Sequence, residues 1–290
     1  MSKRSHSNGA AANPFQHQAD LVFERMSRYI GRLAGNPKAE DVHRFRTNSR
    51  RVESLVDELA PESGNKKKLL KLLSKLRKRA GRVRDLDVQI AFLKDLKIPD
   101  RQNHRAQLLD ILIEEQARRS KKLAKQFDKD RVGQLRKRLR RTESEVAVNG
   151  IDPLKLAMSR LPKPSATPPT EKMLHACRIA AKRARYLAEL AADSAEAKNF
   201  IAELKRAQDE IGQWHDVLKL SQRAERLFGG VHDSVLVAAL QNISRARFRR
   251  AGTALQVALK AISEAQQKAR EPARPQPGGE TGAAAKSAAA

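Results

Sequence analysis

Two segments of the chain carry a histidine followed by basic residues at the same spacing, His-x-x-Arg-x-x-x-Arg or Lys. The residues are His43, Arg46 and Arg50 in the first segment and His175, Arg178 and Lys182 in the second. On an α-helix this spacing places three side chains within about 60° of one another, in a line along the axis. Arginine binds phosphate through two hydrogen bonds, lysine through a mobile charge, and histidine through either ring nitrogen. Each segment therefore predicts a helical ridge that can hold an elongated anion.

The two segments resemble each other beyond this pattern. VHRFRTNSRRVESL, residues 42–55, aligns without gaps on LHACRIAAKRARYL, residues 174–187, and the alignment also pairs Arg51 with Arg183. A second match lies downstream, where AGRVRDLDV aligns on IGQWHDVLK with an offset that differs by one residue. Two further pairs of equivalent residues follow from it: Gly81 with Gly212 and Asp85 with Asp216. A match on this scale predicts an internal duplication of two four-helix units related by a pseudo-twofold axis.

A third basic segment lies between the two ridges. From Lys66 to Arg84 the chain has ten Lys or Arg residues and no acid. Like charges so close together destabilise an isolated helix, so an apolar stripe must hold this helix against the core. Several cations flank that stripe or follow on the next helix, and we expect them to line the walls of a groove between helices: Lys75, Arg79, Arg82, Arg136 and Arg140.

The composition predicts an all-α protein that binds a polyanion. Of the 290 residues, 40% are hydrophobic but only 4% are aromatic, so aliphatic side chains that suit packed helices must build the core. The 59 Lys and Arg against 33 Asp and Glu give a formal charge of +26. A compact fold with that excess gains stability whenever a polyanion binds. The alternative is a basic surface that only keeps the protein in solution.

Apolar periodicity and helix-breaking residues divide the chain into amphipathic helices. They are expected at 15–34, 39–60, 66–97, 101–147, 152–160, 170–192, 195–228 and 232–269. Four prolines between residues 161 and 170 indicate a linker. The predicted organisation is a disordered N-terminus at 1–13, a first bundle at 14–160, the linker, a second bundle at 171–270 and a disordered tail at 271–290.

The remaining features indicate a cytoplasmic protein without a membrane segment. The N-terminus lacks the apolar core of a secretory signal, and no stretch approaches the roughly 18 apolar residues of a membrane span. The single cysteine, Cys177, cannot form an internal disulfide, which fits a reducing compartment, and its apolar neighbours indicate a packed side chain.

A polymer of phosphates is the expected ligand, because binding it would release condensed counterions. A nucleic acid is the alternative, but the few aromatic residues offer no platform for stacking bases, and no zinc-finger or RNP motif occurs. Motifs of phosphoryl-transfer enzymes are also missing, and the acids nearest to the ridges, Asp85, Asp87 and Asp216, are expected to pair with arginines. We therefore expect no catalytic residue, no metal ligand and no cofactor.

These motifs resemble the CHAD family, the conserved histidine α-helical domain, over about residues 15–265. The resemblance implies two four-helix bundles around a basic central channel that binds inorganic polyphosphate, and association with polyphosphate granules. It also implies the binding residues: His43, Arg46, Arg50 and Arg51 in the first copy and His175, Arg178, Lys182 and Arg183 in the second. Other phosphate-rich polyanions are further candidate partners.

Two departures from the family pattern bear on these expectations. Many relatives are fused to a CYTH-type triphosphate-tunnel enzyme, whose strand motif is not found here, so a stand-alone binder is expected. The second copy has Gln213 where the first has Arg82, which lowers the charge that its third helix contributes. Two other functions stay open at this point: an architectural protein associated with nucleic acid, and a phosphatase or kinase that acts on polyphosphate.

Overall fold

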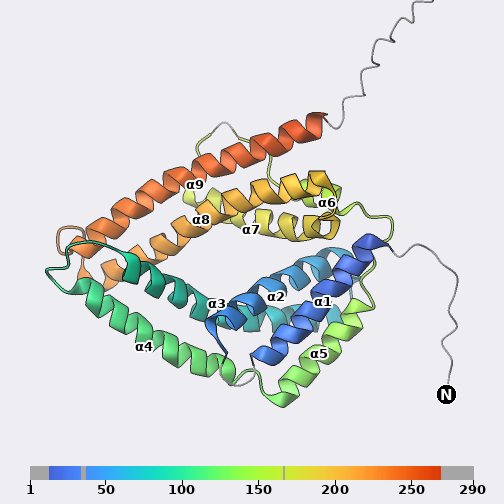
Figure 1. Cartoon of the computed structure of the whole chain (residues 1–290), viewed down its shortest axis with the longest axis horizontal. Helices are drawn as coiled ribbons and strands as arrows, with labels where there is room; N and C mark the ends of the chain where they lie inside the picture. The colour runs from blue at the N-terminus through green and yellow to red at the C-terminus, as the bar shows by residue number, and fades with distance from the viewer. Residues whose placement is uncertain (1–12, 34–36, 166, 269–290) are drawn as a thin grey trace, which may run out of the picture.

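The computed structural model describes residues 13–33, 37–165 and 167–268, and within them every regular element is a helix (Figure 1). This confirms the predicted all-α class. The helices are α1 (Pro14–Arg32), α2 (Ala39–Leu59), α3 (Gly64–Asp95), α4 (His104–Ala124), α5 (Lys129–Glu143), α6 (Pro153–Ser159), α7 (Glu171–Ala188), the 3-10 turn η1 (Glu189–Ala191), α8 (Ala195–Phe228) and α9 (Val235–Lys268).

Local capping explains where most of these helices begin. The side chains of Asn13, Ser63, Thr170 and Ser194 each accept a hydrogen bond from a backbone N–H in the first turn of the helix that follows. Such caps satisfy donors that have no partner inside the helix. At the other end, α8 stops at Gly229, whose φ of 80° a residue with a side chain rarely adopts.

The predicted single helix over 101–147 is wrong, because the structure has two helices there, α4 and α5. The chain turns at Phe127, which is buried with its ring 5.2 Å from that of Phe45 in an edge-to-face contact. Asp128 then caps α5 by accepting a hydrogen bond from the N–H of Arg131 at 2.8 Å. The turn lets α5 pack against α1 and α3, where a continuous helix would project away from the core.

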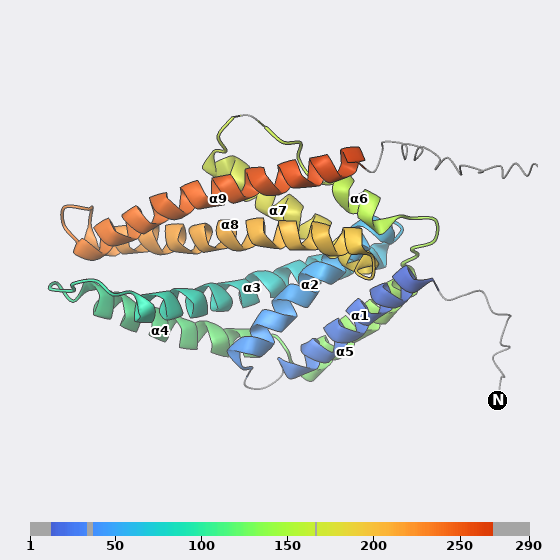
Figure 2. The ribbon, with the colours of Figure 1, turned by 45° about the horizontal axis from the view of Figure 1, so that its top comes forward.

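The helices form two layers, α1–α5 and α6–α9, that face each other (Figures 1 and 2). Across the boundary α2 packs against α7, and α3 packs against α8. These are the two pairs of helices that carry the matching sequence motifs. Residues 161–165 and 167–170 form no regular element and lead from α6 to α7.

Two apolar clusters join the layers. One contains Leu55 of α2 together with Ala184 and Leu187 of α7, and the other contains Leu93 of α3 and Leu220 of α8. Between the residues of α8 that enter these two clusters, Ile211 and Trp214 belong to a third cluster, while Nζ of Lys219 lies 3.7 Å from the carboxylate of Asp85 on α3. The layers are therefore joined by apolar contacts on either side of a region where polar side chains face each other.

The predicted disordered segments lie outside the described residues, apart from Asn13, which caps α1. None of the described helices has a stretch long and apolar enough to cross a membrane.

Candidate anion-binding site

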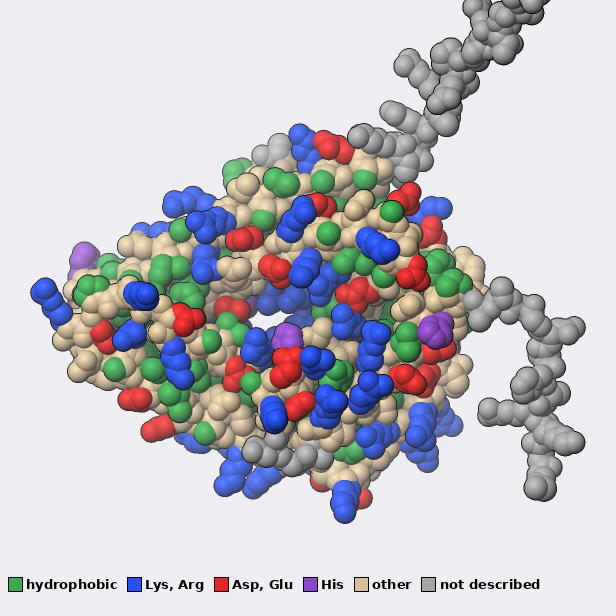
Figure 3. Space-filling model, in the orientation of Figure 1, with side chains coloured by type: hydrophobic (Ala, Val, Ile, Leu, Met, Phe, Trp, Pro, Cys, Tyr) green, Lys and Arg blue, Asp and Glu red, His purple; other side chains and the backbone are tan. Residues whose placement is uncertain are grey.

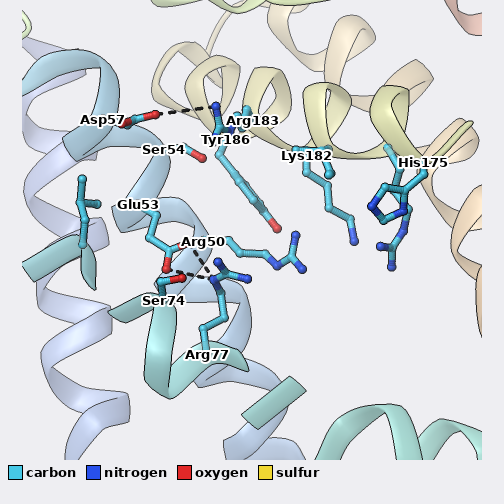
Figure 4. A pocket seen from close by; sticks show the side chains of 13 residues that line it. Arg50, Glu53, Ser54, Asp57, Ser74, Arg77, His175, Lys182, Arg183 and Tyr186 are labelled. Atoms are coloured by element: carbon cyan, nitrogen blue, oxygen red, sulfur yellow. Dashed lines mark hydrogen bonds and ion pairs between the residues drawn. The ribbon is translucent and has the colours of Figure 1, made fainter. Parts of the chain in front are cut away.

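A pocket of about 370 Å³ lies between the layers, with walls from α2, α3 and α7 (Figure 4). We call it the central pocket. Its lining combines basic, acidic and small polar side chains: Arg50, Glu53, Ser54, Asp57, Leu70, Ser74, Arg77, His175, Arg178, Ile179, Lys182, Arg183 and Tyr186. In the space-filling view, Lys and Arg side chains also line a hollow between α8 and the helices α2 and α3 (Figure 3).

The basic side chains of the central pocket converge from both layers. Arg50 of α2 extends toward Lys182 of α7, while Arg77 of α3 donates hydrogen bonds to Glu53 at the wall (Figure 4). His175 lies about two helical turns before Lys182 on α7. The two ridges thus contribute to one pocket: Arg50 comes from the first ridge, and His175 and Lys182 come from the second.

Three of these cations, Arg50, Arg178 and Lys182, form no ion pair within 4 Å in the part of the chain that the structure describes. We call them the unpaired cations. In Arg178, the buried Nε atom also has no hydrogen-bond partner. Burial and the neighbouring Arg46 lower the pKa of Arg50 to about 10. Burial and the charges of Arg178 and Arg50 lower the pKa of Lys182 to about 6. The pocket therefore holds more positive charge than its own acids offset.

The acids of the pocket are already occupied by other cations. Glu53 accepts hydrogen bonds from Nε of Arg77 at 2.9 and 2.7 Å, and burial still raises the pKa of its carboxyl group. Asp57 lies 3.7 Å from the guanidinium of Arg183. These pairs fix Arg77 and Arg183 at the pocket wall and leave the unpaired cations without a carboxylate.

Arg46 and its surroundings extend the basic region beyond the central pocket. Burial lowers the pKa of Arg46, Asp85 opposes the shift from 3.7 Å away, and Arg178 adds to it. A side chain at Gly81 would collide with the guanidinium of Arg46, so this glycine makes room for it. At the equivalent Gly212 there is open space instead.

His215 is a half-buried neighbour of this region that the sequence did not single out. Its ring lies 5.6 Å from that of His175. Burial, followed by the charges of Arg178 and Lys219, lowers its pKa to about 3. Because His215 stays neutral at ordinary pH, it can donate one hydrogen bond without adding to the repulsion.

Two further predicted binding residues of α2, His43 and Arg51, lie outside the central pocket. His43 is more exposed than buried, in a separate groove beside Glu40 and Arg44, and the partial burial of its ring and the charge of Arg84 lower its pKa. Arg51 donates a hydrogen bond to Glu189 at 2.6 Å and stacks on the ring of Tyr186. That contact joins α2 to the end of α7, and the carboxylate of Glu189 neutralises the charge of Arg51.

The structure places the other predicted cations of α3 elsewhere. Arg79 and Arg82 line a groove between α3 and α4, and Lys75 is exposed on the same side of α3. By helical geometry these three side chains lie about 140–160° around α3 from Arg77. Arg77, which the sequence did not single out, is the α3 cation that faces the central pocket. The sequence did contain a signal for Arg77: it lies four residues before Gly81, one of the residues matched between the two halves, and so shares its face of the helix.

Arg136 and Arg140 of α5 also lie away from the central pocket. They line a groove between α1 and α5 with Arg28, Glu24 and Glu143, which we call the α1–α5 groove. There Arg136 donates to the backbone oxygen of Ser27 at 3.4 Å. The pocket and the groove are therefore separate basic sites.

The chemistry that the central pocket offers is multiple donation to oxygen atoms. Guanidinium, ammonium and imidazole groups from three helices surround it, an arrangement that suits an anion with several oxygens in a row. Within the described residues there is no group of three or more His, Cys, Asp or Glu side chains arranged to hold a metal ion.

Comparison with known proteins agrees with the sequence motifs. The family model described as CHAD domain matches residues 17–225. The crystal structure of the CHAD domain from the plant Ricinus communis is similar in fold, with a TM-score of 0.57 and 20% sequence identity. The similarity covers 92% of this chain and 95% of that one. A comparison with curated protein sequences gave no match.

Proposed function

The chain belongs to the CHAD family, and from that premise we propose that it binds inorganic polyphosphate in the central pocket. The family is associated in general with polyphosphate binding. Polyphosphate is a linear anion with oxygens along its whole length, which fits a pocket lined by donors from α2, α3 and α7.

The observation that carries this proposal is the convergence of three unpaired cations in one half-buried place. Arg50, Arg178 and Lys182 come from two helices that are far apart in sequence. Burial, and to a smaller extent the charges of Arg178 and Arg50, lower the pKa of Lys182 to about 6. A structural role alone gives no reason to collect like charges at a cost in stability. A bound polyanion removes that cost.

We further propose that the halves at 14–160 and 171–270, joined by the linker at 161–170, arose by internal duplication of a four-helix unit. Since the described part of 171–270 holds α7, η1, α8 and α9, the fourth helix of the second unit would be α6, which lies before the linker. The packing of α2 on α7 and of α3 on α8 supports the proposal, because a pseudo-twofold axis between the units would bring equivalent helices together in this way. Cations of the two motifs also come together. Burial lowers the pKa values of Arg46 and Arg50, and the charge of Arg178 lowers them further, so both residues lie close to Arg178.

Binding without turnover is part of the proposal. The acids of the central pocket, Glu53 and Asp57, are engaged by Arg77 and Arg183. Phosphoryl-transfer sites usually keep carboxylates available to metal ions. The check is to incubate the protein with polyphosphate and magnesium or manganese and follow chain length on a gel. Stable chains are expected, and shortening would make the protein a phosphatase.

We also propose that the protein works in the cytoplasm and associates with polyphosphate granules, since a binder of the polymer collects where the polymer is stored. A fluorescent fusion should colocalise with granules and become diffuse in cells that lack polyphosphate.

The direct test is equilibrium binding to polyphosphate and to duplex DNA at equal phosphate concentration over a series of salt concentrations. Preferential binding to polyphosphate that persists at moderate salt supports the proposal, because a shaped pocket adds donors to simple charge attraction. Equal affinity per unit charge at every salt concentration would favour the architectural nucleic-acid protein.

A further inference from the structure

The outward face of α3 carries six exposed cations in a row. They are Lys67, Lys68, Lys71, Lys75, Lys78 and Arg82. None of these six has an ion-pair partner within 4 Å among the described residues. The reason lies in the sequence, since no acid occurs between Glu62 and Asp85. Of the six, only Arg82 has an acid three or four residues away on its own helix, and that acid, Asp85, lies 3.7 Å from Arg46 and from Lys219 instead.

Some exposed cations elsewhere on the molecule are paired in that way, although others, such as Arg249 and Arg250 of α9, have no ion-pair partner within 4 Å among the described residues. Arg44 lies 2.5 Å from Glu40, and Arg206 lies 2.7 Å from Glu203. Both pairs have the i,i+3 or i,i+4 spacing that stabilises a helix. On the face of α3 the same spacing brings cation next to cation, which is destabilising. On this face, therefore, neighbouring cations repel one another, as the cations of the central pocket do.

This face is continuous with the central pocket. Ser74 lines the pocket, and Lys71 and Lys78 lie three residues before it and four residues after it on α3. Side chains at these spacings are neighbours, with Cβ atoms about 5–6 Å apart. Lys71 lies four residues before Lys75, and Lys78 lies four residues before Arg82, so these pairs are neighbours on the helix as well.

At its other side the face opens into the groove between α3 and α4, which has a volume of about 320 Å³. Arg79 and Arg82 form one wall of this groove, and cations of α4 and the turn after it form the other: Arg119, Lys122 and Lys125. Among the residues that the structure describes, no acid lines this groove, and of its cations only Arg119 has an ion-pair partner, Glu115, at 2.6 Å.

We propose that the outward face of α3 and the α3–α4 groove form a second segment of the polyanion-binding surface, occupied by the part of a long phosphate chain that leaves the central pocket. The inference rests on the proposed function and adds to it a preference for long chains. A short chain fills the pocket alone, whereas a long chain also gains the contacts along α3.

The test compares long-chain polyphosphate with tripolyphosphate on one variant, K71Q/K75Q/K78Q/R82Q. Glutamine keeps a good helix propensity, so α3 stays folded. Affinity for the long chain should fall roughly tenfold, because each exposed contact contributes little alone. The slope of log affinity against log salt should become shallower by about 3, at ~0.7 for each lost phosphate contact on a flexible strand. Affinity for tripolyphosphate should not change.

A matched control removes the same charge from the far layer, with R245Q/R249Q/R250Q/K260Q on α9, where all four side chains are exposed. If this control weakens long-chain binding as much as the α3 variant does, the effect is one of net charge and the inference is wrong. It is also wrong if the α3 variant keeps its affinity for the long chain and loses affinity only for duplex DNA. Failure of tripolyphosphate to bind the wild type, with the α3 effect intact, would instead contradict the central pocket.

Discussion

The central pocket and the α1–α5 groove have the same volume, about 370 Å³, and both contain several arginines, yet positive and negative charges are balanced differently in them. In the central pocket burial and crowded cations lower the pKa of Lys182 to about 6. In the groove burial and the nearby carboxylates of Asp20 and Glu24 raise the pKa of Glu143. The pocket has an excess of positive charge, and the groove has acids that would repel an anion.

The number of arginines therefore does not identify an anion site. Arg136 is half-buried, forms no ion pair within 4 Å among the described residues, and has an Nε without a hydrogen-bond partner, as Arg178 has. What separates the sites is that Glu24 and Glu143 line the groove without an ion pair of their own in the described part of the chain, whereas Arg77 and Arg183 engage the acids of the pocket. An anion added to the pocket therefore removes repulsion between cations as well as gaining contacts. Arg136 and Arg140 belong to the groove, and Arg50, Arg178 and Lys182 belong to the pocket.

The largest effect is expected from removing the unpaired cations. The variant R50Q/R178Q/K182Q should lose at least about a hundredfold in polyphosphate affinity, since each charged hydrogen bond contributes roughly 1.5–3 kcal/mol. Its control is R28Q/R136Q/R140Q, which removes the same charge from the α1–α5 groove and should change affinity by less than about threefold. Equal losses measured by titration would erase the distinction between the two sites.

A smaller effect concerns stability and pH. The folded-state pKa of Lys182 is about 6, against 10.5 for an ordinary lysine. Between these values the unfolded chain binds a proton that the folded chain does not, so the free energy of unfolding rises with pH. One group contributes at most about 1.4 kcal/mol for each pH unit. Below pH 6 both states carry the proton and this dependence disappears.

Lys182→Met should therefore raise the free energy of unfolding near pH 7 and flatten its rise with pH, while weakening polyphosphate binding. The exposed Lys172 on the same helix supplies the control, since Lys172→Met should leave the pH dependence as in the wild type. Urea unfolding at several pH values measures both. A destabilised Lys182→Met with an unchanged slope would mean that the ammonium is well compensated in the free protein.

Next in size is a pair of glycine substitutions at equivalent positions. Gly81→Ala forces the guanidinium of Arg46 to move and should weaken polyphosphate binding severalfold without loss of helix stability. Gly212→Ala meets open space, so it should raise stability by up to about 1 kcal/mol and leave affinity unchanged. Identical affinities for the two variants would show that the placement of Arg46 does not matter for binding.

The smallest effect on binding is expected where the α1–α5 groove is weakened directly. Asp128→Ala removes the cap of α5, the helix that carries Arg136 and Arg140 of the groove, and should cost about 1 kcal/mol of stability. Thermal unfolding measures the loss. Polyphosphate affinity should equal that of the wild type, and a marked decrease would show that α5 contributes to polyphosphate binding.

Much of the fold follows from local sequence, because apolar periodicity and caps such as Ser63 and Thr170 are encoded within a few residues. The break between α4 and α5 was missed because its cause is the burial of Phe127 against Phe45, a contact between distant segments. Asp128 offered a local signal for the new helix start, but it lay inside a continuous amphipathic pattern.

For the site, the duplicated pattern picked out Arg50, Arg178 and Lys182, all of which line the central pocket. Arg77 was missed since ten cations between residues 66 and 84 look alike in sequence. The loss of Arg51 to an ion pair depends on Glu189, which lies 138 residues away. His43 lies two turns from Arg50, about 10 Å along α2, and so falls beyond the pocket.

In the proposed complex a chain of phosphates occupies the space among the unpaired cations. NMR of the protein labelled with ¹⁵N in its arginine side chains, titrated with tripolyphosphate, tests this placement. The Nε signals of Arg50 and Arg178 should shift and sharpen with saturation, while those of Arg136 and Arg140 stay in place. Shifts at Arg136 and Arg140, with the signals of Arg50 and Arg178 unmoved, would contradict the account.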